Sequence, residues 1–178
     1  MGTPRTNSRE RILAAAADVA REAGPGSVSL DAVAHRAGVS KGGLLYNFPS
    51  KAALMKGLVA SYVDAFERDL EEAVAAGEPL VSAYLRLAAE ACAEDETAAW
   101  IFAAVAEDPN FLEPVKRHRE RLLDRLKAHS TDTAGILVAF FAIEGLLSMK
   151  LFGTTLVSAE ERTIMIDRLR AITGATET

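Results

Sequence analysis

The chain of 178 residues has little of the chemistry that marks enzymes, metalloproteins and secreted proteins. Its single cysteine, Cys92, excludes an internal disulfide framework and fits a reducing cytosol. Its three histidines, His35, His118 and His129, fall in separate predicted helices without partners at metal-ligand spacing. Nucleophile-elbow, Walker and dinucleotide-binding signatures are missing as well. We therefore expect neither a catalytic site nor a bound metal or cofactor.

Targeting signals and long hydrophobic runs are also scarce. The polar N-terminal residues do not have the apolar core of a secretory signal. The most apolar stretch, residues 134–149, contains Glu144 and is too short and too polar to span a bilayer comfortably. The sequence therefore predicts a buried helix at this position and a cytoplasmic protein that has no membrane partner.

Charge is distributed unevenly along the chain, although the net charge is only −5. Residues 1–56 hold 8 Lys and Arg against 4 Asp and Glu, which gives +4. Residues 57–178 hold 12 basic against 21 acidic residues, which gives −9. A basic head on an acidic body predicts that one end of the chain binds a polyanion.

Apolar residues recur every three or four positions, Ala and Leu dominate, and alternating β-branched runs are not found. This pattern predicts an all-α fold of about nine helices, with Gly and Pro mostly between them. Ser, Asn or Asp residues stand at several of the expected helix starts, where they can act as N-caps. The expected helices cover residues 7–23, 30–37, 40–46, 51–76, 79–93, 97–106, 111–129, 132–152 and 158–172.

Two short helices joined by a tight turn at residues 37–40 have the spacing of a helix-turn-helix. Gly38 gives the turn the backbone freedom that it needs. In such units the second helix enters the major groove with its N-terminal residues foremost. Glycine is a poor helix former, so Gly42 and Gly43 in the first turn are explained if the backbone there approaches DNA closely. The alternative is a helix start that merely tolerates glycine.

The run A-G-V-S-K-G-G-L-L-Y-N-F-P-S-K resembles the N-terminal domain of the TetR-type bacterial transcriptional regulators. The wider similarity begins near Arg9 with R-x-x-I-L-x-A-A and ends near Leu58. The rest of the chain is similar only in being helical and of suitable length. The resemblance implies a DNA-binding three-helix head at residues 1–50, followed by a ligand-binding and dimerisation bundle at residues 51–178.

The resemblance also implies where the chain contacts its double-stranded DNA operator. Leu45 stands where these regulators typically have Tyr, and Asn47 stands where they often have His. Tyr46 can replace part of the lost aromatic contact, and an asparagine can still donate to a phosphate oxygen. The expected DNA-binding residues are Ser29, Ser40, Lys41, Gly42, Gly43, Tyr46, Asn47 and Lys51.

Large apolar residues on several predicted helices of the acidic body are candidates for a ligand pocket, although for any one of them core packing is the favoured explanation. Glu144 is the lone acid in an apolar stretch, and a buried carboxylate is costly unless it is paired. Two roles are open for Glu144: it orients a cationic or hydroxylated ligand, or it meets Lys150, an arginine or solvent at an interface. The candidate pocket residues are Tyr62, Phe66, Trp100, Phe102, Phe140, Phe141, Glu144 and Met149.

These observations predict a transcriptional regulator, a repressor that a small-molecule effector releases from its operator. The apolar helix at about residues 132–153 and the helix at about 158–173 are the expected homodimer face. Two alternatives stay open from the sequence. One is a helical enzyme or small-molecule carrier, and the other is a protein-binding adaptor with a non-functional DNA head.

Overall fold

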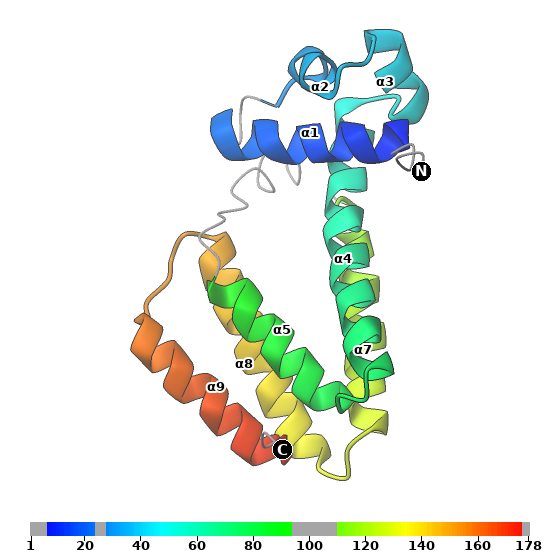
Figure 1. The fold of residues 1–178 in the computed structure, drawn as a ribbon. Helices are drawn as coiled ribbons and strands as arrows, with labels where there is room; N and C mark the ends of the chain where they lie inside the picture. The colour runs from blue at the N-terminus through cyan, green and yellow to red at the C-terminus, as the bar shows by residue number, and fades with distance from the viewer. Residues whose placement is uncertain (1–6, 24–27, 94–109, 176–178) are drawn as a thin grey trace. The chain divides into compact units, whose positions relative to one another are not determined.

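The computed structural model describes residues 7–23, 28–93 and 110–175, and within these ranges the chain forms eight α-helices and no strand (Figure 1). The predicted all-α fold is confirmed. The expected helix at residues 97–106, with Trp100 and Phe102, lies outside the described ranges. The helices are α1 (Ser8–Ala23), α2 (Leu30–Ala37), α3 (Lys41–Asn47), α4 (Lys51–Ala75), α5 (Leu80–Ala93), α7 (Glu113–Ala128), α8 (Thr133–Leu151) and α9 (Ala159–Thr173).

The described residues divide into two compact units. The first contains residues 7–63 and 110–115, and the second contains residues 64–93 and 116–175. The long helix α4 belongs to both, because it runs from Lys51 in the first unit to Ala75 in the second. Each unit has its own hydrophobic core.

Serine caps define the short helices of the first unit. The Ser29 hydroxyl oxygen accepts a hydrogen bond from the Ala32 N–H at 3.1 Å, and α2 ends at Gly38 with a left-handed φ of 62°. Ser40 accepts in the same way from the Gly43 N–H at 3.0 Å and begins α3. These bonds satisfy N–H groups that a helix start would leave unpaired, so the local sequence fixes both helix starts.

The core of the first unit lies between α1, α2, α3 and the start of α4, and α1 packs against both α2 and α3. From α3, only Leu44 is buried. A Cβ atom built on Gly57 of α4 would lie 2.6 Å from the Phe48 ring, so close packing requires glycine at this position. Arg11 of α1 donates a 2.7 Å hydrogen bond to the Ala37 carbonyl, which ties α1 to the turn between α2 and α3.

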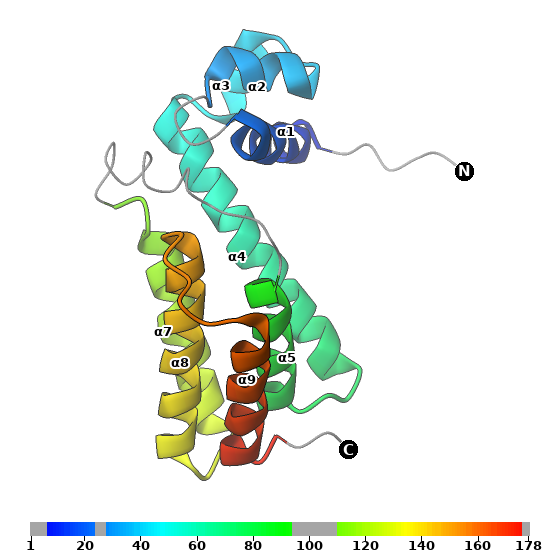
Figure 2. The ribbon, with the colours of Figure 1, turned by 90° about the vertical axis from the view of Figure 1, so that its left-hand side faces the viewer.

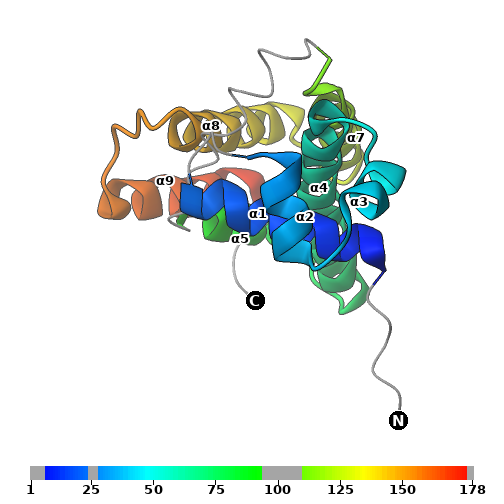
Figure 3. The same ribbon diagram turned by 90° about the horizontal axis from the view of Figure 1, so that it is seen from above.

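The second unit joins α5, α8 and α9 with the C-terminal part of α4 and most of α7. Helices α8 and α9 run antiparallel and pack side by side, as Figures 2 and 3 show from two directions. Asp132 caps α8 through the Gly135 N–H at 2.9 Å, and Ser158 with Glu161 forms a complete capping box at the start of α9. The predicted caps at both helices are therefore present. Lys150 of α8 donates to the Ala91 carbonyl at the end of α5, and so joins these two helices.

Among the described helices, only α8 is long and apolar enough to cross a membrane by length and composition. One of its faces packs against α5 and α9, as in the core helix of a globular protein. Its other face leaves large apolar side chains in solvent, with Val138 54% and Phe141 64% exposed. Leu147 is half-buried against the second core, so it is not part of this exposed face.

Candidate functional site

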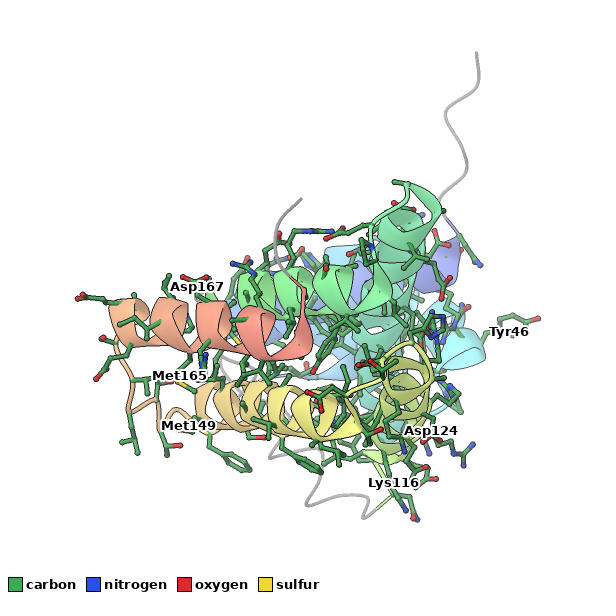
Figure 4. The ribbon with its side chains drawn as sticks, turned by 90° about the horizontal axis from the view of Figure 1, so that it is seen from below. Tyr46, Lys116, Asp124, Met149, Met165 and Asp167 are labelled. Carbon is green, nitrogen blue, oxygen red and sulfur yellow. The ribbon has the colours of Figure 1, made fainter. Side chains whose placement is uncertain are left out.

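The first candidate site is the outer surface of α2, α3 and the start of α4. Tyr46 is 91% exposed and projects from α3 into solvent (Figure 4). Because this ring is not packed in a hydrophobic core of the chain, it is available to contact a partner molecule. The other expected DNA contacts lie on the same three segments: Ser29, Ser40, Lys41 and Gly42 are exposed, and Gly43, Asn47 and Lys51 are half-buried.

Several polar side chains of this surface already have partners within the chain, among them Lys41 and Asn47. The Lys41 ammonium lies 2.9 Å from the Asp31 carboxylate, and both side chains are more than half exposed. An exposed ion pair of this kind is weak, so Lys41 can exchange it for a phosphate or a base at little cost. The Asn47 amide donates to the Gly43 carbonyl at 2.8 Å, which directs this side chain along α3. Asn47 must turn away from that carbonyl before it can contact DNA.

The two glycines at the start of α3 differ in how much room a side chain would have. The nearest heavy atom to a Cβ built on Gly42 would be the Ser40 hydroxyl oxygen at 3.9 Å, an ordinary contact. At Gly43 the same oxygen would lie at 3.3 Å, a tight contact with the hydroxyl that caps α3, so this position has a steric reason to be glycine. Because glycine weakens a helix, the packing of the described residues does not explain the glycine at position 42.

The second candidate site is a cluster of aromatic and charged side chains in the second unit. Of the expected pocket residues, Phe140 is buried, and Phe66, Glu144 and Met149 are half-buried in this unit. Tyr62 is 44% exposed and belongs to the first unit. Phe141 is 64% exposed, which suits an interface between chains better than the wall of a ligand site. Trp100 and Phe102 lie outside the described residues.

Sequence reasoning missed Tyr84 of α5, which lies at the centre of this cluster. Its ring stacks on Phe140 at 6.2 Å between centroids and meets the edge of Phe66 at 6.5 Å. Tyr84 is 3% exposed, and its hydroxyl has no hydrogen-bond partner among the described residues. Burial raises the pKa of this phenol, and the Glu144 carboxylate raises it further, so the hydroxyl keeps its proton. In the sequence, nothing distinguishes Tyr84 from any other aromatic residue that packs in a hydrophobic core.

Glu144 of α8 pairs with the Arg119 guanidinium of α7, as one of the sequence alternatives anticipated. Burial raises the pKa of Glu144, whereas the charge and hydrogen bond of Arg119 act in the opposite direction. A second carboxylate, Glu67 of α4, lies 2.8 Å from Nδ1 of the buried His118 and also pairs with Arg125. Four helices thus bring acids, bases and aromatic rings together in one unit.

A Tyr84→Phe variant should be more stable than the parent protein. A buried hydroxyl without a partner costs about 1–3 kcal/mol, and removing the oxygen while keeping the ring removes that cost. A gain of about 1 kcal/mol raises Tm by roughly 2–4 °C in a chain of this size. Differential scanning calorimetry measures the change, and an unchanged or lower Tm would mean that the hydroxyl is satisfied in solution.

Comparison with known protein families finds a matching family model in each part of the chain. A profile described as "Tetracyclin repressor-like, C-terminal domain" matches residues 78–174, and one described as "Bacterial regulatory proteins, tetR family" matches residues 12–58. The chain belongs to the TetR family. It is therefore a DNA-binding transcriptional regulator of helix-turn-helix type. The family is not enzymatic, which confirms the expectation that the chain is not an enzyme.

Solved structures of TetR-like fold cover nearly the whole chain. A candidate transcriptional regulator from Streptomyces coelicolor A3(2) is 24% identical, with 94% of this chain and 99% of the other covered and a TM-score of 0.69. A candidate TetR-family regulator from Mesorhizobium loti is 18% identical, with 98% of both chains covered and a TM-score of 0.72. The multidrug binding protein EbrR, complexed with imidazole, is 23% identical over 92% and 95% of the chains, with a TM-score of 0.66. No curated protein matches this TetR-family chain in sequence.

Proposed function

We propose that this TetR-family regulator is a cytoplasmic homodimeric repressor that leaves its operator when a small molecule binds the second unit. The observation that carries the DNA contact is the outer surface of α3, where Lys41 and Gly42 at its start and Tyr46 near its end are exposed. In this proposal Lys41 and the backbone of Gly42 and Gly43 approach the bases. The other expected contacts, Ser29, Ser40, Tyr46, Asn47 and Lys51, hold the phosphates.

A stripe along α8 supports the homodimer. Its residues follow one another along the helix and its C-cap at alternating spacings of four and three positions: Ala134, Val138, Phe141, Gly145, Ser148 and Phe152. Val138, Phe141 and Phe152 are each more than half exposed, a costly arrangement for a protomer alone. A Cβ on Gly145 would meet nothing within 4 Å, so no contact within the described protomer requires glycine there. Small residues between large apolar ones allow a second helix to pack closely.

The proposed effector binds the cluster around Tyr84, because a buried polar group without a partner can be satisfied by a ligand. The structures of EbrR include complexes with malachite green, ethidium and proflavin, so a protein of this fold binds small molecules. Phe66 of the cluster lies on α4, the helix whose other end carries Lys51. A ligand that favours a different position of α4 therefore weakens DNA binding, and DNA weakens ligand binding by the same factor.

The experiment that tests this function is selection of duplexes from a random pool by the purified full chain, followed by sequencing. A repressor of this kind should select a site with two half-sites about 34–36 Å apart, one helical turn, or a multiple of that distance. The fluorescence anisotropy of a labelled selected duplex then reports affinity and stoichiometry. Enrichment of no site, together with no salt-sensitive duplex binding, would refute the proposal.

Replacing Lys51 by alanine should weaken binding to every duplex by a similar factor. Lys51 lies in the first turn of α4, where its ammonium and the helix N-terminus can hold one phosphate together. Losing one phosphate contact reduces the slope of log K against log salt concentration by about one unit per half-site. Titrations at several salt concentrations measure the slope, with Lys116→Ala on α7 as the matched control. An unchanged slope would remove Lys51 from the phosphate contacts.

A further inference from the structure

The chemistry of the cluster around Tyr84 points to one class of effector, an inference that rests on the proposed function. The ring of Tyr84 is held between Phe140 and Phe66, and Phe66 in turn meets the buried His118 ring at 5.7 Å. The position of the Tyr84 hydroxyl is therefore fixed by packing, although it makes no hydrogen bond to a described residue. A ligand hydrogen-bonding group at this oxygen would remove the cost of leaving it unpaired.

The charged pair beside Tyr84 is asymmetric. The Glu144 side chain is 19% exposed, whereas that of its partner Arg119 is 41% exposed. Arg119 can thus move into water with little penalty, but Glu144 cannot follow it. An anionic ligand that captured Arg119 would leave a half-buried carboxylate without a counterion. A cationic ligand that captured Glu144 would leave only a solvated guanidinium.

The other acid of the cluster is already compensated. Glu67 lies beside His118, Arg125 and, at 3.9 Å, Arg121. Among the described residues, Glu144 has Arg119 as its single ion-pair partner. Of the two acids in this cluster, Glu144 is therefore the one that a second cation can reach by displacing one flexible side chain. Three aromatic rings lie together in this unit: Tyr84 and Phe140 are buried, and Phe66 is half-buried. Aromatic rings attract both flat ligands and cations, so a ligand in this cluster would meet a favourable environment.

We propose that the effector is an aromatic organic cation that displaces Arg119 from Glu144 and shares a hydrogen bond with the Tyr84 hydroxyl. Arg119 then acts as a resident competitor: it neutralises Glu144 in the unliganded protein and is released when the cation binds. The ion pair between α7 and α8 is exchanged for a contact between ligand and α8. This exchange gives the ligand a means of favouring a second arrangement of these helices.

A set of three probes of nearly equal size and shape tests the charge preference. 2-Naphthamidine is a cation at neutral pH, 2-naphthamide is neutral and 2-naphthoate is an anion. Isothermal titration calorimetry or saturation-transfer NMR on the full chain without DNA measures each Kd. We expect the amidine to bind at least tenfold more tightly than the naphthoate, with the amide between them.

Four variants assign the preference to residues. Glu144→Gln should reduce the preference for the amidine over the naphthoate at least tenfold. Arg119→Gln should tighten amidine binding severalfold, because the competitor is gone, whereas Lys116→Gln on the same helix should not. Tyr84→Phe should weaken amidine binding at least threefold even though it stabilises the fold. Circular dichroism of each variant shows that the helices are retained.

The inference is overturned if the naphthoate binds as tightly as the amidine, or if Glu144→Gln leaves the preference intact. It is also overturned if Arg119→Gln weakens amidine binding. Anisotropy with the selected duplex, run on the same samples, separates this inference from the proposed function. A protein that binds its operator but shows no cation preference refutes only the effector class. A protein that binds no duplex refutes the repressor function, whatever the probes do.

Discussion

Replacing Phe141 by glutamate should convert the protein into a monomer and weaken operator binding at least a hundredfold. Phe141 is 64% exposed in the protomer, so the new carboxylate is solvated there and leaves the core of the unit intact. In the proposed dimer the same carboxylate would enter a dry helix contact without a partner, which is strongly unfavourable. A monomer presents only one recognition helix, and the second half-site no longer contributes to affinity.

Analytical ultracentrifugation at micromolar concentration measures the change in mass, and anisotropy measures operator affinity. Ala128→Glu provides the matched control, since it adds the same charge at an exposed position at the end of α7. The control should remain a dimer with parental affinity. A parent protein that sediments as a monomer would contradict the dimer proposal, as would a Phe141→Glu variant that still dimerises.

Replacing Gly42 by glutamine should make the head more stable and operator binding much weaker. A helix gains up to about 1 kcal/mol when a good helix former replaces glycine. Within the protomer the new Cβ meets nothing closer than 3.9 Å, so no steric penalty offsets this gain. If the α3 backbone lies against DNA, the added side chain separates the two surfaces. We expect a loss of roughly tenfold to a hundredfold, the range for one direct base contact of about 1–3 kcal/mol.

The opposite signs of the two effects make this substitution informative. Thermal unfolding followed by circular dichroism gives the stability change, and titration of the selected duplex gives the affinity change. Ala128→Gln adds the same side chain far along the sequence and should change neither greatly. Parental operator affinity in the Gly42→Gln variant would show that the α3 backbone does not approach DNA closely.

The helices could be predicted from sequence because their starts and ends are set by neighbouring residues. Four predicted helices begin after a capping side chain that accepts a hydrogen bond from the backbone N–H three positions ahead. The capping residues are Ser29, Ser40, Asp132 and Ser158. Such bonds need no information from the rest of the fold. Where boundaries differ, as at the start of α7 at Glu113 rather than near residue 111, the difference is two residues or fewer.

The charged cluster could not be predicted because its contacts join helices that are distant in sequence. In the basic run at residues 116–127, Glu120 and Asp124 lie among the basic residues at a spacing of four, a pattern that predicts a solvated helix face with charges paired along one helix. Lys127 and Asp124 do pair in that way. However, Arg119 pairs with Glu144 of α8 and Arg125 with Glu67 of α4, and His118 is buried between elements. No local spacing indicates which of several arginines meets which acid.

In α3, the residue that packs in the core differs from the residues that face outward. This separation affects how the regulator can change its DNA target during evolution. Leu44 alone anchors this helix in the core, and the turn before it is held from α1 by Arg11. The residues that face outward, such as Lys41, Leu45 and Tyr46, contribute little to the core of the head. Substitutions at these positions can therefore accumulate without unfolding the protein. A gene duplicate can acquire a new DNA target while keeping its scaffold, together with the proposed dimer surface and effector site.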